Sequence, residues 1–126
     1  MSSLLESSLR ENDYDKIKQI AKSDLHNHGS NGGRLSYLNQ YFGKEVQAPS
    51  ERFVSIEELE WWITKKIGCE FPGKTGYCKR IEAAFVQCHE DGIKVLCMSF
   101  TLEEIKYWGN ISNFMFIINT TLQLYK

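Results

Sequence analysis

The alternation of apolar and polar positions along this chain predicts a mixed fold of strands and helices. Residues 93–100 are almost continuously apolar, which is typical of a buried parallel strand, and residues 20–26 form a second candidate strand. Elsewhere, apolar residues recur at spacings of three and four, as they do on one face of a helix. Helices are predicted over about 4–18, 35–42, 56–67, 77–91 and from 112 to the end of the sequence.

Capping and turn residues indicate where several of these helices begin and end. Asp13 can cap a second turn within the first helical segment. The segments 55–58 and 101–104 are both capping boxes, and the second predicts a further short helix. Gly68 is predicted to end the helix that follows the first box. Residues 69–76, which contain a proline and two glycines, are then predicted to form a connector.

The predicted order is strand, helices, strand and helices, which is the pattern of an α/β protein. Strands joined through helices imply a parallel pair with a crossover connection. A sheet of two parallel strands leaves faces and edges open, and the apolar helical pattern continues to Lys126 without a stop signal. We therefore expect about two parallel strands and several helices from the opening part of a larger unit, with self-association through the incomplete core.

Composition excludes some classes of partner. The 126 residues include 15 basic and 16 acidic side chains, so there is no electrostatic case for nucleic acid or an anionic membrane. No apolar run approaches the length of a membrane span, and the N-terminus is too polar for a secretory signal, so a cytoplasmic protein is expected. The four cysteines lack zinc-ribbon spacing, and Cys88 and Cys97 are predicted to be buried thiols.

The segment Asp24-Leu25-His26-Asn27-His28 carries the strongest candidate chemistry. Alternation along a strand places Asp24, His26 and His28 on one side. Two neutral imidazoles at this spacing can hold a divalent metal, and nitrogen ligands suit zinc, iron or nickel. A pair of histidines at the end of a surface strand is the alternative. The glycine-rich residues 29–33 follow, and they let the backbone leave the strand and approach a ligand closely.

The third histidine is a weak candidate for a further ligand. His89 precedes Gly92 in a segment that is typical of a helix C-terminus. A histidine there interacts favourably with the negative end of the helix dipole. The sequence therefore predicts a structural role for His89 and two metal ligands only, His26 and His28.

Residues 22–28, taken with the distant Glu90-Asp91-Gly92 turn and the apolar residues after it, resemble the N-terminal part of the adenosine deaminase family of metal-dependent amidohydrolases. The resemblance implies a (β/α)8 barrel, with residues 1–19 as a helical lead-in and residues 20–126 as a partial barrel. It implies that His26 and His28 are the first two ligands of a catalytic zinc, which activates water for hydrolytic deamination of adenosine or a related purine or nucleoside.

The resemblance also implies what this sequence lacks. The family's third histidine ligand, its aspartate ligand and its general acid lie on later strands and have no counterpart here, so no catalytic residue is assigned and the chain alone is expected to be inactive. The family continues its H-x-H motif with Leu-Asp-Gly, whereas residues 29–33 contain no acid. Ser30 or Asn31 can hydrogen-bond a sugar hydroxyl instead, or the segment is simply a turn.

Two other classes of protein fit parts of the sequence. Phosphoesterases of the polymerase-and-histidinol-phosphatase type also open with D-x-H-x-H, and Ser30-Asn31-Gly32 resembles their following loop, but the next strand here is distant and carries no histidine. The second alternative is an inactive truncated fragment or a helical interaction protein. In that case the apolar residues 114–118 form an exposed interface.

Overall fold

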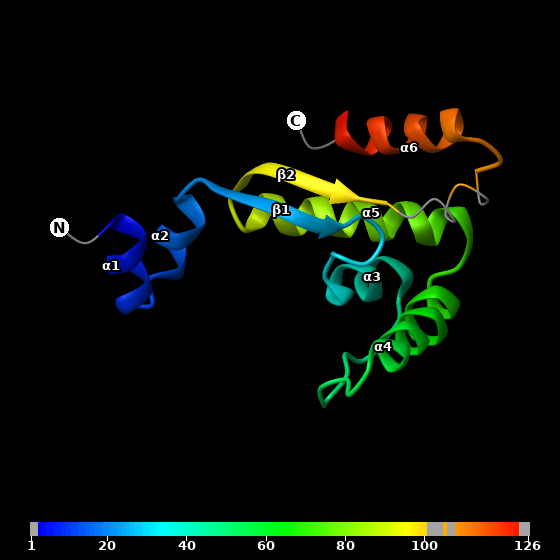
Figure 1. Cartoon of the computed structure of the whole chain (residues 1–126), viewed down its shortest axis with the longest axis horizontal. Coiled ribbons are helices and arrows are strands. Elements are labelled where there is room, and N and C mark those ends of the chain that lie inside the picture. The colour runs from blue at the N-terminus through cyan, green and yellow to red at the C-terminus, as the bar shows by residue number, and fades with distance from the viewer. Residues whose placement is uncertain (1–2, 101–104, 106–107, 124–126) are drawn as a thin grey trace.

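The computed structural model describes residues 3–100, 105 and 108–123, which form a mixed α/β fold with six α-helices and one two-stranded parallel sheet (Figure 1). This confirms the predicted class and the predicted parallel pair. In chain order the elements are α1 (Leu4–Arg10), α2 (Tyr14–Gln19), β1 (Lys22–His28), α3 (Leu35–Phe42), α4 (Ile56–Trp62), the π-helical turn η1 (Ile63–Gly68), α5 (Gly73–Glu90), β2 (Ile93–Ser99) and α6 (Ile111–Gln123).

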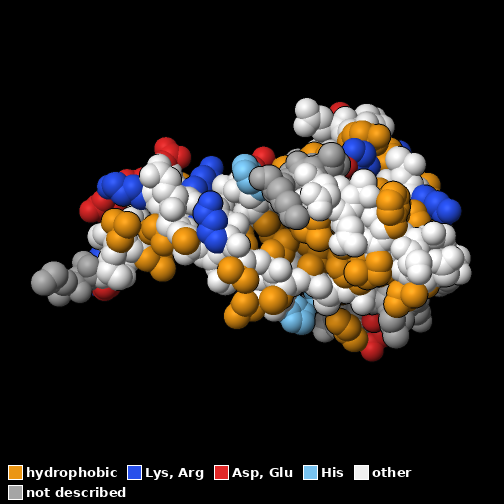
Figure 2. Space-filling model, turned by 90° about the horizontal axis from the view of Figure 1, so that it is seen from above, with side chains coloured by type: hydrophobic (Ala, Val, Ile, Leu, Met, Phe, Trp, Pro, Cys, Tyr) orange, Lys and Arg blue, Asp and Glu red, His pale blue; other side chains and the backbone are white. Residues whose placement is uncertain are grey.

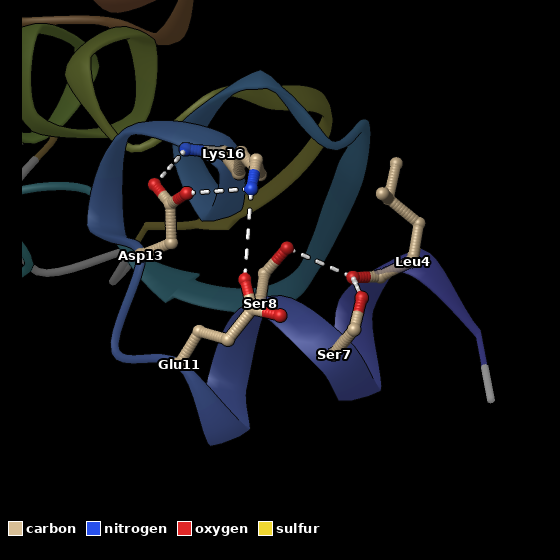
Figure 3. Close-up of polar contacts among 6 residues, drawn as sticks. All are labelled: Leu4, Ser7, Ser8, Glu11, Asp13 and Lys16. Carbon is tan, nitrogen blue, oxygen red and sulfur yellow. Dashed lines mark hydrogen bonds and ion pairs between the residues drawn. The ribbon is translucent and has the colours of Figure 1, made fainter.

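The N-terminal segment forms a pair of short helices that stands at one end of the sheet, away from the other helices (Figure 1). As predicted, Asp13 caps the second helix, since its carboxylate accepts a hydrogen bond from the Lys16 N–H at 3.1 Å. The Lys16 ammonium lies 2.9 Å from the same carboxylate, and both contacts lower the pKa of Asp13 (Figure 3). Within α1, Ser8 is fully buried and its hydroxyl donates to the Leu4 carbonyl at 2.8 Å.

The two strands pair from Lys22 opposite Ile93 to His28 opposite Ser99. The first strand therefore begins and ends two residues later than the sequence predicts. Ile20 still belongs to the end of α2, where its N–H donates to the Lys16 carbonyl. The Lys22 ammonium stabilises the short connection between α2 and β1, because it donates to the Ile20 carbonyl at 2.9 Å.

The main core joins α5, α6 and one face of β2. The spacing of apolar residues in the sequence predicts one buried face for α5, and the four residues on that face are all buried: Ile81, Ala84, Phe85 and Cys88. From α6, Phe114 and Ile118 pack into the same cluster, and Leu96 and Met98 of β2 close it. The spacing of apolar residues in the sequence also places Leu122 on the buried face of α6, but Leu122 remains 37% exposed.

A second cluster packs α3 and η1 against α5, with Leu38, Ile67, Phe71 and Ala83 buried in it. Here two predicted boundaries are wrong. Gly68 does not end its helix, because the backbone stays helical through Glu70, and α5 begins at Gly73 rather than at residue 77. The predicted connector 69–76 therefore shrinks to the two residues 71–72, where the proline stops the preceding helix.

The other face of the sheet is open. Leu96 and Met98 point into the main core, so Val95 and Cys97 alternate to the opposite face, where Val95 is 54% exposed and Cys97 is exposed. The expectation that helices cover both faces of β2 is therefore wrong for the described residues. The predicted burial of Cys97 is wrong for the same reason, whereas Cys88 on α5 is buried as predicted.

The predicted capping box at residues 101–104 and the helix after it lie outside the described residues. In the part of the chain that is described, no helix is long and apolar enough to cross a membrane.

Candidate metal centre

The candidate metal centre is built on a bulge in β1. Asp24 pairs with Leu96, and Asn27 pairs with Met98. Two residues of β1 therefore lie opposite the single residue that separates Leu96 from Met98. This is a β-bulge, which shifts the alternation of side chains along the bulged strand by one position.

The bulge separates Asp24 from the two histidines. The partner of Asp24, Leu96, faces the main core, and the Asp24 carboxylate accepts hydrogen bonds from Asn27 Nδ2 at 2.8 Å and from the His26 N–H at 3.1 Å. These two donors lower the pKa of Asp24. Asn27 also contacts Cys88 Sγ on α5 at 3.8 Å. The prediction that Asp24 shares one side with both histidines is therefore wrong, and Asn27, to which sequence reasoning gave no role, helps to hold the bulge.

His26 and His28 do come together. Their Nε2 atoms lie 3.2 Å apart, with ring centroids 5.0 Å apart and the rings inclined at 68°. Two nitrogen atoms bound to one tetrahedral zinc at about 2.0–2.1 Å lie roughly 3.3–3.4 Å from each other. The observed 3.2 Å is close to the separation that one metal ion requires of two imidazole ligands, and it is also the distance of a direct hydrogen bond between the two rings.

The surroundings of the pair provide no third ligand from the described residues. Among them, no group of three or more His, Cys, Asp or Glu side chains is close enough to hold a metal ion. His89 lies exposed in the last turn of α5 and, as expected from the sequence, is not brought to the pair. Both His26 and His28 are exposed to solvent.

The glycines after His28 serve close packing within the chain. A Cβ atom added to Gly33 would overlap the backbone of Ala83 on α5, and one added to Gly29 would overlap the ring of Phe100. Neither glycine has a positive φ. The close approach that these glycines allow is therefore to the chain's own helix and ring, and the predicted approach to a ligand stays a prediction.

Ser30 and Asn31 line a cavity of about 150 Å³ that is otherwise mainly apolar, with Leu38 and Trp62 in its wall. Ser30 is only 6% exposed. Neither His26 nor His28 lines this cavity. The cavity is also smaller than the roughly 300–1,000 Å³ of ordinary small-molecule sites. The contact of Ser30 and Asn31 with a substrate therefore stays a prediction.

No protein-family model matches this sequence, and comparisons with curated proteins and with solved structures likewise find no match. The resemblance to the adenosine deaminase family therefore rests on the motif residues and their spacing in the sequence.

Proposed function

We propose that this chain supplies the first two metal ligands of a zinc-dependent hydrolytic deaminase that acts on adenosine or a related purine or nucleoside. His26 and His28 are the ligands, and the two described strands are the first two strands of a (β/α)8 barrel. The observation that carries the proposal is the 3.2 Å separation of the two Nε2 atoms.

The position of the pair supports the same proposal. His28 is the last residue of β1, and the chain turns away immediately after it through Gly29, whose N–H donates to the Ser99 carbonyl at 2.9 Å. The pair thus lies at the carboxyl end of a parallel strand. Barrel enzymes place their active sites at that end of their strands.

The donor set fits a catalytic zinc, since such sites commonly use histidine ligands. When bound, zinc supplies Lewis acidity that makes water nucleophilic at neutral pH. Asp24 holds the main chain of His26 in the bulge, because its carboxylate accepts from the backbone N–H of His26. They contain neither a third ligand group nor an assigned proton donor. Deaminase activity therefore requires residues beyond those described, and the chain alone is proposed to be inactive. Iron and nickel accept the same two ligands.

The test uses the protein as its native cell makes it. The His26→Ala variant should lose bound zinc and ammonia release from adenosine together, whereas the His89→Ala variant should keep both. Because His26 is exposed, its replacement removes no core packing. Full activity in the His26→Ala protein contradicts the ligand assignment. A different outcome is that the His26→Ala variant loses zinc while the unsubstituted protein releases no ammonia from adenosine. That outcome contradicts the deaminase activity but leaves the metal site in place.

One observation favours a second candidate, a non-catalytic interaction protein. Figure 2 shows hydrophobic side chains gathered across the middle of one face of the molecule and again over the N-terminal helices. On α6, Phe116 is 68% exposed and Ile111 is 59% exposed, although Phe114 and Ile118 of the same helix are buried. Exposed apolar patches of this kind are typical of binding surfaces. Wild-type zinc affinity in the micromolar range or tighter favours the metalloenzyme over this candidate.

A further inference from the structure

Asn27 is a polar residue on the inner face of β1, between the two histidines. It pairs with Met98, which packs against the main core, and its Nδ2 lies 3.8 Å from Cys88 Sγ on α5. Side chains alternate along a strand, so a residue that points inward places both of its neighbours outward. The neighbours of Asn27 are His26 and His28, and both are exposed.

The Asn27 carboxamide contacts three separate parts of the chain. Its Nδ2 donates to one oxygen of the Asp24 carboxylate at 2.8 Å, and the other oxygen accepts from the backbone N–H of His26 at 3.1 Å. Its Oδ1 lies against Gly32, where an added Cβ would overlap that oxygen. Cys88 on α5 provides the third contact. One side chain therefore links the bulge, the glycine-rich loop and the helix beneath the strand.

The Oδ1 atom of Asn27 is in an unfavourable position for stability. It is buried, and among the described residues no donor lies within hydrogen-bonding distance of it. A buried acceptor without a partner destabilises a fold, and an apolar side chain of similar shape avoids that cost. Local arrangements that reduce stability are typical of functional sites. The position of Asn27 between two candidate metal ligands indicates which function its side chain serves.

We infer that Asn27 is a positioning residue for the metal ion. Its side chain holds His26 and His28 on one face of β1, with their Nε2 atoms 3.2 Å apart, before the ion binds. Ligands that are already in place lose less conformational freedom on binding, so the affinity for the ion increases. Asn27 acts through the strand and through Asp24, and it does not bind the ion itself. This inference rests on the metal pair of the proposed function and does not depend on deamination.

The test measures zinc affinity and stability in parallel on the full 126-residue chain. Competition with a chromophoric chelator gives the Kd for Zn²⁺, and thermal unfolding without zinc gives the Tm. Asn27→Leu keeps a side chain of similar size but removes the donor and the unpaired oxygen. It should weaken zinc binding at least about tenfold, since partners that orient metal ligands contribute about 10–100-fold. Its Tm should be no lower than that of the wild type.

A second asparagine provides the matched control. Asn39 donates to the Val46 carbonyl at 2.8 Å and accepts from the Val46 N–H at 3.1 Å, in the loop after α3. Asn39→Ala should therefore lower the Tm and leave the Kd for Zn²⁺ unchanged. If Asn27→Leu loses zinc affinity only together with a lowered Tm, its role is structural and the inference is overturned.

A double variant tests whether Asn27 acts through Asp24. Residues that act through one shared hydrogen bond give non-additive effects. Asp24→Ala combined with Asn27→Leu should therefore lose no more zinc affinity than the weaker-binding single variant, and fully additive losses contradict the inference. An unchanged Kd in Asn27→Leu overturns the inference but leaves the metal pair in place. A wild-type chain that binds no zinc overturns both.

Discussion

Arg34 joins the two parts of the sequence motif, because its Nη1 donates to the Glu90 carboxylate at 2.6 Å across 56 residues of the chain. Its Nη2 donates to the Asp91 carboxylate at 3.1 Å. The loop that follows the histidines is thereby tied to the turn that leads into β2. Sequence reasoning did not find this link, because nothing in the local pattern indicates which acidic residue an exposed arginine will meet.

Replacing Arg34 with Gln should lower the free energy of unfolding by less than about 1 kcal/mol, because all three side chains are roughly half exposed. The loss should shrink in about 1 M salt, which screens exposed charges. Urea unfolding at low and high salt measures both effects. A salt-independent loss above about 2 kcal/mol would show that Arg34 acts through packing instead.

Gly33→Ala should destabilise the fold by about 1–3 kcal/mol, the usual cost of forcing a methyl group into a packed site. The new Cβ meets the backbone of Ala83, which cannot move aside cheaply. Gly68→Ala is the matched control, since its nearest neighbour is 3.6 Å away and the position is helical. Alanine there should stabilise by about 0.5–1 kcal/mol. Thermal unfolding of both variants checks the predicted opposite signs, and equal signs contradict the packing assigned to Gly33.

The cysteines should differ in their rate of alkylation. Cys69 and Cys97 are exposed, whereas Cys88 is buried and burial raises the pKa of its thiol, so little thiolate forms at neutral pH. Mass spectrometry after a short exposure to iodoacetamide should find Cys69 and Cys97 modified and Cys88 intact. In denaturant all four should react. Early modification of Cys88 in the folded chain is the result that contradicts its burial.

The free energy of unfolding should depend on pH through the Glu70 carboxylate. The Lys44 ammonium donates to the Glu70 carboxylate at 2.8 Å and lowers its pKa. The contribution of a carboxyl whose folded pKa is lowered is fully present above its unfolded pKa of about 4.3 and is lost as pH falls through the folded value. Lys44→Met should therefore be less stable than the wild type at neutral pH, and the difference should narrow below about pH 4. Unfolding free energies measured between about pH 7 and pH 2.5 check this, and a constant difference contradicts it.

Periodic patterns in the sequence predicted the types of the elements well, because they reflect burial on one face. The buried face of α5, including Ile81 and Phe85, is an example. The ends of helices that were predicted from glycine positions were less accurate than the types of the elements. Gly76 lies buried in the first turns of α5, where a Cβ would overlap the carbonyl of Phe71 five residues earlier, so this glycine allows the connector to approach the helix closely and does not end a connector. Glycine is equally frequent in turns, so its presence alone does not distinguish the two roles.

The candidate site was predictable for a similar reason, and only in part. The i and i+2 spacing of His26 and His28 leads to a close pair in the structure. The separation of Asp24 from that pair arises from the bulge, which depends on how β1 pairs with Met98 and Leu96 of the other strand. The register of two strands far apart in sequence is set by the whole core, so local alternation does not reveal it.

In the proposed site, His26 and His28 together bind one divalent metal ion. Long-range ¹H–¹⁵N spectra of the imidazoles test this most directly, because the chain has only three histidines. Addition of Zn²⁺ should shift the Nε2 resonances of His26 and His28 at the same zinc concentration and leave His89 unchanged. Zinc that leaves the resonances of both His26 and His28 in place, or shifts His89 alone, contradicts the account.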